Sequence, residues 1–335
     1  MQAVVLAGGL GTRLRPLTFN RPKALVPLLN RPQVLHILDR LPKAVDEAFV
    51  AVSYMQDRVR DFFRETDLGL EVTVIEEEDP LGTGGAVKNA AAKIDDTFIV
   101  CNGDVIDSLD FPAFLKFHRK NKALASIALY EVEDPSAFGV VAMEQGRITR
   151  FVEKPPVEKA PSRLINAGRY VFEPEVLDFI APGRAVSMET EVFPRLAEKG
   201  LFGFPFGGYW SDAGTLRGYL TAASLLLEDG GAGIDVGAKV GKARLDGAVL
   251  IADGCVLSGR IGPDAVLGPG CRVDAASVER STLMEGAQVE AGAVVRGSII
   301  GEDTTVGPGA TVEDSIVGDG ARVRKGRRVI RERMA

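Results

Sequence analysis

Aliphatic residues spaced six positions apart in the C-terminal part of the chain are the feature that most restricts its fold. This interval separates Ile261, Leu267 and Val273, then Leu283, Val289 and Val295, then Val306 and Val312, and then Val317 and Val323. A period of six with one inward aliphatic residue per step is typical of a parallel β-helix, in which each coil stacks on the one before it. We therefore predict a left-handed β-helix of hexapeptide repeats rather than a β-sandwich with regular turns. The five-residue steps on either side of Val278 are interpreted as irregular turns.

The N-terminal part is organised differently, because short apolar runs alternate there with amphipathic segments. Apolar runs at 3–7, 48–54, 71–77, 97–104, 125–132 and 169–174 predict strands, whereas 32–41, 56–64, 111–120 and 216–227 have helical spacing. Alternating strands and helices predict an α/β domain with a Rossmann-like, mostly parallel sheet. Ligands of such sheets bind beyond the carboxyl ends of the strands.

Length and composition limit the function classes. The chain has 335 residues, enough for two domains, and its net charge of −6 gives no electrostatic reason to expect nucleic acid or an anionic membrane as a partner. No leader-like segment opens the sequence, and no apolar run is long enough to cross a bilayer. Cys101, Cys255 and Cys271 form neither a disulfide framework nor a zinc pattern. We therefore expect a cytoplasmic protein.

The stretch AVVLAGGLGTRLRPLT, residues 3–18, reads as a buried strand followed by a glycine-rich loop and two arginines. Glycines at 8, 9 and 11 allow a ligand to approach the backbone closely, and free N–H groups after a strand suit phosphate. The forked guanidinium groups of Arg13 and Arg15 add donors for phosphate oxygens. The loop is neither a P-loop nor a dinucleotide fingerprint. A tight turn with solvated arginines is the alternative.

Eight motifs occur in the order found in sugar-1-phosphate nucleotidyltransferases, a family that the chain therefore resembles: GGLGTRLRPLT, PKALVPL, LGTGGAV, NGDV, FGVV, FVEKPP, NAGRYVF and GYWSDAGT. Within this family AVSYM, EEEDPLGTGGA and SMETEVFP are most similar to guanylyltransferases that act on mannose 1-phosphate. The resemblance implies a nucleotidyltransferase domain at 1–228 and a β-helix domain at 234–335. It also implies transfer of a nucleotidyl group from a nucleoside triphosphate to a sugar 1-phosphate, with release of pyrophosphate.

The resemblance assigns a role to residues in each motif. Arg13, Lys23, Asp104 and Asp212 are expected to be catalytic, and the two aspartates to bind Mg²⁺, a cation that prefers a few carboxylates together with phosphate oxygens and water. The nucleotide is expected to contact Leu6, Ala7, Gly8, Gly9, Gly11, Thr12, Arg13, Glu77, Gly82, Thr83 and Gly103. The sugar phosphate is expected to contact Gly139, Glu153, Lys154, Asn166 and Gly168. Arg15 is expected to have one of two roles, a contact with phosphate or a structural role.

The acidic run before LGTGGAV indicates which base is read. Related thymidylyl- and uridylyltransferases have a glutamine five residues before the glycine that opens the second loop, and here that glycine is Gly82 and the residue is Glu77. An ionised carboxylate only accepts hydrogen bonds, and guanine presents two adjacent N–H donors, so we predict GTP in preference to UTP and dTTP. Glu76 and Glu78 remain open for the same role, and a solvated acidic turn is the alternative.

Three alternative functions share features with this sequence. A glucose-1-phosphate uridylyl- or thymidylyltransferase is the alternative within the family. A non-catalytic regulatory relative would be expected to lose the glycine loop and the metal aspartates, which are present here. Hexapeptide-repeat acyltransferases rely on a histidine general base, and residues 234–335 contain no histidine, so we predict no acyl transfer. The β-helix is expected to serve assembly, most simply as a homo-oligomer.

Overall fold

The computed structural model describes residues 1–335. The chain forms two compact units, one of Met1–Gly9 with His36–Trp210 and one of Leu10–Leu35 with Ser211–Ala335. Helix α1 (Gln33–Leu38) contains the point at which the chain returns from the second unit to the first. No helix combines the length and the apolar character that a membrane span requires.

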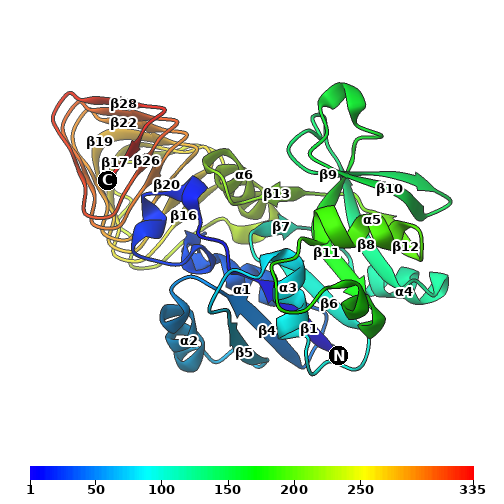
Figure 1. Cartoon of the computed structure of the whole chain (residues 1–335). Coiled ribbons are helices and arrows are strands. Elements are labelled where there is room, and N and C mark those ends of the chain that lie inside the picture. The colour runs from blue at the N-terminus through cyan, green and yellow to red at the C-terminus, as the bar shows by residue number, and fades with distance from the viewer. The chain divides into compact units, whose positions relative to one another are not determined.

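A nine-stranded mixed sheet forms the centre of the first unit, in the order β5-β4-β1-β6-β11-β8-β12-β10-β9 (Figure 1). Strands β10 and β11 run opposite to the other strands, which share one direction. The sheet is therefore mostly parallel in direction, as predicted, but β11 between β6 and β8 makes it mixed. The bounds are β1 (Gln2–Leu6), β4 (Glu47–Val52), β5 (Glu71–Glu76), β6 (Phe98–Asn102), β8 (Ala125–Glu131), β9 (Gly139–Glu144), β10 (Arg147–Glu153), β11 (Leu164–Phe172) and β12 (Leu201–Pro205).

Helices pack on this sheet and bury its apolar side chains. The helices are α2 (Gln56–Glu65), α3 (Gly82–Ala90), α4 (Phe111–Asn121) and α5 (Phe193–Ala197), with the short helical segments η4 (Val157–Lys159), η5 (Pro174–Phe179) and η6 (Met188–Val192). Val4, Val100, Ile127 and Phe172 are fully buried in one continuous core. Burying each such side chain contributes about 1.5–3 kcal/mol. The short strand β7 (Val105–Asp107) also belongs to this unit, and within β13 (Trp210–Asp212) the chain passes to the second unit.

The second unit contains the predicted β-helix, whose stacked coils are seen in Figure 1. Paired residues stand 17 positions apart in most coils, as Leu283 and Ile300 do, and the inward aliphatic side chains are buried. From Leu283 the steps are six, six and five, and this order repeats through Val295, Ile300 and Val312 to Val329. One five-residue step is therefore a regular part of each coil from Leu283 onwards. The irregular turns predicted on either side of Val278 lie in the preceding coil, where Leu267 pairs with Leu283 after 16 residues and the register of β17 and β19 shifts next to Val273.

The β-helix has one sheet along one side and a second that bends around the other two. The first sheet runs through β14 (Gly233–Ile234), β16 (Val249–Ile251), β18 (Ala265–Leu267), β20 (Ser281–Leu283), β23 (Ile299–Ile300), β26 (Ile316–Val317) and β29 (Arg333–Met334). The second contains β15 (Arg244–Leu245), β17 (Val256–Ile261), β19 (Arg272–Glu279), β21 (Gln288–Val289), β22 (Val294–Arg296), β24 (Thr305–Val306), β25 (Thr311–Glu313), β27 (Arg322–Val323) and β28 (Arg328–Ile330).

Residues 10–35 and helix α6 (Leu216–Leu226) complete the second unit. The segment contains the single turns η1 (Thr12–Leu14), η2 (Leu17–Phe19) and η3 (Lys23–Leu25) and the short hairpin of β2 (Pro27–Leu28) and β3 (Arg31–Pro32), while η7 (Leu227–Gly231) follows α6. The Tyr219 hydroxyl donates to the Pro27 carbonyl, and the Asn30 amide donates to the Leu267 carbonyl at 3.1 Å. Residues 10–35 thus rest on α6 and on a coil of the β-helix.

Candidate functional site

In the first unit, the carboxyl ends of β1, β4, β5 and β6 meet at one edge of the sheet. Just beyond β1, the Ala7 N–H donates to the Ala51 carbonyl at 2.8 Å, and the Ser53 hydroxyl donates to the Gly8 carbonyl at 2.6 Å. Leu6, Ala7 and Gly8 therefore lie at the edge where the sequence predicted a ligand, and Gly9 follows them.

The turn that carries Asp104 lies at the same edge, after β6. The Gly103 N–H donates to the Leu6 carbonyl at 2.9 Å, and a Cβ on residue 103 would come within 2.5 Å of that oxygen. Only glycine therefore fits between the first strand and Asp104. The structure brings Gly103 and Asp104 together with the loop after β1, as the two motifs implied.

A buried arginine that the sequence did not single out supports this turn. Arg169 is 2% exposed, and its guanidinium donates to the carbonyls of Asn102 at 2.9 Å and Val105 at 2.6 Å. It also pairs with the buried Asp107 carboxylate at 2.8 Å. Burial alone would lower the pKa of Arg169, but the Asp107 charge and hydrogen bond contribute to a net rise. Arg169 thus stays charged and holds the backbone on both sides of Asp104.

Glu77 differs from its acidic neighbours. It is 5% exposed; one of its oxygens accepts from the Leu81 N–H at 3.2 Å, while the buried Oε1 has no hydrogen-bond partner. Burial raises the pKa of Glu77 above its ordinary value. Glu76 is paired with Arg60, and Glu78 is exposed. Of the three candidates, only Glu77 has a buried acceptor left over for a ligand.

The glycines after Glu77 were expected to form a loop, and this expectation was wrong, because helix α3 begins at Gly82. The Val186 carbonyl accepts from the Gly84 N–H at 2.8 Å and lies where a Cβ on Gly82 would stand. The Thr83 hydroxyl donates to Glu189 at 2.7 Å and accepts from the Met188 N–H at 2.9 Å. The side chain of Thr83 is thus bound within the protein, and its predicted contact with a nucleotide remains a prediction.

The residues predicted for the sugar phosphate lie on β9, β10 and β11, except Lys154, which directly follows β10. Gly139 stands opposite Glu153, and a Cβ on Gly139 would come within 2.9 Å of Glu153 Oε2, a buried atom with no hydrogen-bond partner. Burial raises the pKa of Glu153 despite the Lys154 ammonium 3.3 Å from its other oxygen. The Asn166 side chain accepts from the Gly168 N–H at 3.0 Å and donates to the Tyr170 hydroxyl at 2.9 Å.

In the second unit, three of the predicted catalytic side chains converge around a glycine. A Cβ on Gly214 would come within 2.7 Å of Asp212 Oδ1 and 2.8 Å of Arg13 Nη2, and would overlap the ammonium of Lys23. Asp212 Oδ1 also accepts from the Gly214 N–H at 2.7 Å. Sequence reasoning missed Gly214, although it stands in the same YWSDAGT motif as Asp212.

Arg13 reaches this point from a tightly closed loop. Gly11 has a φ of 62°, which favours glycine, and the turn η1 carries Thr12 and Arg13 directly after it. The Thr18 hydroxyl donates to the Gly11 carbonyl at 2.8 Å, so the loop folds back on itself. The loop thereby presents the guanidinium of Arg13 beside the buried ammonium of Lys23.

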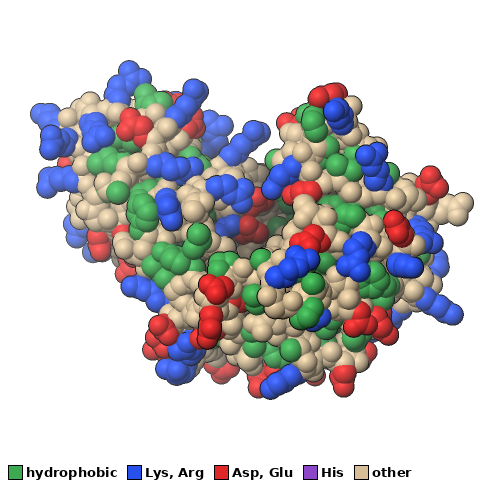
Figure 2. All heavy atoms as spheres, viewed as in Figure 1, with side chains coloured by type: hydrophobic (Ala, Val, Ile, Leu, Met, Phe, Trp, Pro, Cys, Tyr) green, Lys and Arg blue, Asp and Glu red, His purple; other side chains and the backbone are tan.

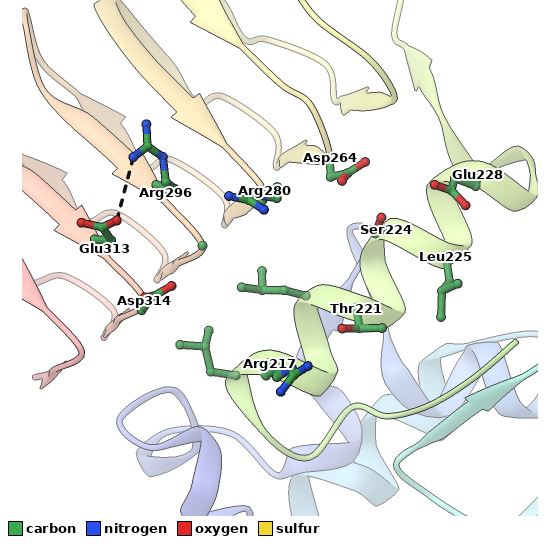
Figure 3. Close-up of a pocket in the computed structure, with 13 residues that line it drawn as sticks. Arg217, Thr221, Ser224, Leu225, Glu228, Asp264, Arg280, Arg296, Glu313 and Asp314 are labelled. Carbon is green, nitrogen blue, oxygen red and sulfur yellow. Dashed lines mark ion pairs between the residues drawn. The ribbon is translucent and has the colours of Figure 1, made fainter. Parts of the chain in front are cut away.

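A separate cavity of about 760 Å³ lies between α6 and the β-helix (Figure 3). Its lining includes Arg217, Arg280, Glu228 and Asp314, and Arg296 pairs with Glu313 at 3.9 Å. Cations and carboxylates are mixed in this lining, and none of the predicted site residues belongs to it. It is therefore not the candidate site.

Comparisons with known proteins show the family to which the chain belongs. The family model described as Nucleotidyl transferase matches residues 2–229, and the GMPPB C-terminal domain matches residues 232–334. The mannose-1-phosphate guanylyltransferase 1 of Arabidopsis thaliana is 38% identical over 92% of this chain and 88% of its own. The mannose-1-phosphate guanylyltransferase of Mycobacterium tuberculosis is 38% identical over 88% of this chain and 83% of its own. A UDP-glucose pyrophosphorylase complexed with UDP-glucose has a TM-score of 0.60, 23% identity and coverage of 68% of this chain and 98% of its own, and so shares the fold.

Proposed function

Because the chain belongs to the nucleotidyl transferase family and has a GMPPB C-terminal domain, we propose that it joins GTP and mannose 1-phosphate to give GDP-mannose and pyrophosphate. The relatives at 38% identity, which span most of both chains, support the choice of substrates. The observation that carries the proposal is the convergence of Arg13, Lys23 and Asp212 around Gly214, since this reaction must neutralise charge on two phosphate substrates.

In this reaction an oxygen of mannose 1-phosphate attacks the α-phosphorus of GTP. The bond from that phosphorus to the bridging oxygen breaks, and the electron pair leaves with pyrophosphate. The attacking oxygen is ionised at neutral pH, so no general base is required. The protein contributes alignment of the two anions and stabilisation of the departing charge, the latter from Arg13 and Lys23.

The donor chemistry of Asp104 and Asp212 fits Mg²⁺, because both offer hard carboxylate oxygens. Asp212 is accessible to a ligand, with 22% of its side chain exposed, and Asp104 is held by a turn that Arg169 fixes. Bound Mg²⁺ would neutralise phosphate charge and help the pyrophosphate to leave. The two aspartates belong to different units, and each is proposed as a ligand on its own evidence.

Glu77 is the proposed reader of the base. Its buried Oε1 lacks a partner, and leaving a buried acceptor unpaired costs about 1–3 kcal/mol. Guanine offers two adjacent N–H donors to a carboxylate, whereas uracil would bring a carbonyl against it. The same argument supports Glu153 as an acceptor for sugar hydroxyls, since its Oε2 is also buried and unpaired. Lys154, the more exposed partner of the ion pair with Glu153, is proposed to contact the sugar phosphate.

The β-helix is the proposed assembly element of a homo-oligomer. Figure 2 shows Lys and Arg side chains gathered over the coils near the C-terminus, where the exposed ones are Arg322, Arg324, Lys325, Arg327, Arg328, Arg331 and Arg333. Like charges on the last coil oppose end-to-end stacking, so we expect copies to pair through the sides of the β-helix. Light scattering of the full chain would show an oligomer, and a monomeric mass would contradict this proposal.

The cytoplasm is the proposed location, in keeping with three free, buried thiols.

Incubation of the full chain with GTP, mannose 1-phosphate and Mg²⁺ tests the proposed reaction. We expect GDP-mannose, identified by mass, to form in step with pyrophosphate. Acetyl-CoA with mannose 1-phosphate or glucose 1-phosphate is expected to give no acyl transfer. Absence of GDP-mannose under conditions in which the protein is folded would overturn the proposal.

A further inference from the structure

An arginine outside the predicted site connects the loop of Arg13 and Lys23 to the β-helix. Arg21 precedes Pro22, at which the turn carrying Lys23 begins. Its side chain is only 14% exposed, and its two terminal nitrogens contact different carboxylates: Nη1 lies 2.5 Å from Glu302, and Nη2 lies 2.8 Å from Asp319. The guanidinium therefore forms a fork with one bond to each acid.

The two acids occupy equivalent corners of consecutive coils. Glu302 lies between β23 and β24, and Asp319 lies between β26 and β27, 17 residues later. Asp319 also accepts from the Glu302 N–H at 3.0 Å, so the acceptor is fixed by the coil backbone. Burial would lower the pKa of Arg21, but the hydrogen bonds and charges of both acids produce a net rise. The fork thus joins the permanently charged Arg21 guanidinium to two stacked coils of the β-helix.

The β-helix also contacts the backbone of this loop at other points. Arg333 donates to the Arg15 carbonyl at 3.3 Å, and a Cβ on Gly318 would come within 2.8 Å of the Pro16 ring. Together with the bond from Asn30 to Leu267, these contacts hold the chain against the β-helix just after Arg13 and on both sides of Lys23. Among them, the Arg21 fork is the charged contact closest in sequence to Lys23.

We propose that Arg21 is a positioning residue, through which Glu302 and Asp319 of the β-helix hold the loop that presents Arg13 and Lys23 to the triphosphate. The inference rests on the proposed function for the roles of Arg13 and Lys23. It gives the β-helix a part in catalysis, in addition to any part in assembly. A displacement of about 1 Å in such groups reduces turnover up to a hundredfold, so the fork has a measurable effect.

The test alters the fork from each side. Arg21→Met removes the guanidinium and keeps the apolar stem, while Glu302→Gln with Asp319→Asn removes the acids and leaves the loop sequence intact. Both variants are expected to lower kcat about tenfold or more, with the KM for mannose 1-phosphate nearly unchanged. Arg21→Lys, which keeps the charge and one contact, should recover part of the rate. Arg296→Met is the matched control, because Arg296 joins Glu279 and Glu313 of neighbouring coils without contacting the loop.

Two further readouts separate positioning from general destabilisation. In a Lys23→Ala background, Arg21→Met should lower kcat less than in the wild-type chain, since one of the two groups to be positioned is gone. Pyrophosphate affinity, measured by calorimetry, should fall severalfold in Arg21→Met and stay unchanged in Arg296→Met. If wild type makes no GDP-mannose, the proposed function fails, while pyrophosphate affinity still tests Arg21. Equal kcat and equal pyrophosphate affinity in Arg21→Met and Arg296→Met would overturn the inference.

Discussion

The Arg13 guanidinium lies 3.4 Å from the Asp212 carboxylate, although 199 residues separate the two in sequence. More than half of the Arg13 side chain is exposed, so solvent screens the pair and its contribution to stability is at most about 1 kcal/mol. A pair that stabilises the fold so little is free to exchange partners. We infer that Arg13 moves from Asp212 to a phosphate oxygen when the triphosphate binds.

Arg13→Ala tests this inference. The melting temperature should change little because the pair is exposed, whereas kcat should fall by about a hundredfold if Arg13 stabilises the departing pyrophosphate. Steady-state kinetics with mannose 1-phosphate varied at saturating GTP would separate the two effects. A rise confined to the KM for mannose 1-phosphate would assign Arg13 to the sugar site instead.

Gly214→Ala tests the convergence of Arg13, Lys23 and Asp212. The added methyl would meet the ends of flexible side chains, which can move aside, so the fold should persist. The displaced ammonium and guanidinium groups should lower kcat at least about tenfold. Gly233→Ala is the control within the same unit, because a Cβ there meets nothing within 4 Å. Equal kcat values for the two variants would show that the space at Gly214 has no catalytic role.

Asp104→Asn and Asp212→Asn test the proposed Mg²⁺ ligands. Each change removes one negative charge without altering shape, so kcat should fall about a hundredfold or more and the Mg²⁺ concentration needed for half-maximal rate should rise. Asp95→Asn, at an exposed surface aspartate, serves as the control. A variant with near-normal turnover at saturating Mg²⁺ would exclude its residue from the metal site.

The pH dependence of GTP use tests Glu77. Burial raises the pKa of this carboxyl above its ordinary value of 4.5, so the ionised form that accepts from guanine is lost at a higher pH than for an exposed glutamate. As pH falls through that raised pKa, kcat/KM for GTP should decline while kcat at saturating GTP declines less. In Glu77→Gln, kcat/KM for GTP and kcat should depend on pH to the same extent, and the preference for GTP over UTP should be smaller. An unchanged profile in Glu77→Gln would rule out Glu77 as the reader.

Much of the fold follows from local sequence patterns. The β-helix was predictable because each coil places aliphatic residues inward at nearly constant intervals. Its repeat is therefore visible as a periodicity in the sequence. The hairpin of β9 and β10 was not predicted, since the alternation of polar and apolar residues in RITRFVE is interrupted where the register shifts between Ile148 and Arg150. Helix α3 was taken for a loop because its first turn contains three glycines, and contacts with Val186, a hundred residues away, accompany the helix there.

Part of the candidate site could likewise be predicted from the sequence, and part could not. Residues within motifs could be assigned from the resemblance, and the structure places Gly103 and Asp104 beside the loop after β1. Arg169 and Arg21 could not be found, because their roles depend on carbonyls and carboxylates that the chain brings to them from other elements. The choice of Glu77 among three acidic neighbours also needed burial and hydrogen bonding, which the sequence does not contain.

The most direct test of the account is kcat/KM for each pairing of GTP, UTP and dTTP with mannose 1-phosphate and glucose 1-phosphate. Pyrophosphate release is measured for the full chain at saturating Mg²⁺. We predict that GTP with mannose 1-phosphate is the best pair, and that UTP is disfavoured by about tenfold or more, as an unpaired contact at Glu77 implies. If UTP or dTTP with glucose 1-phosphate is the best pair, both the proposed reaction and the role of Glu77 are contradicted.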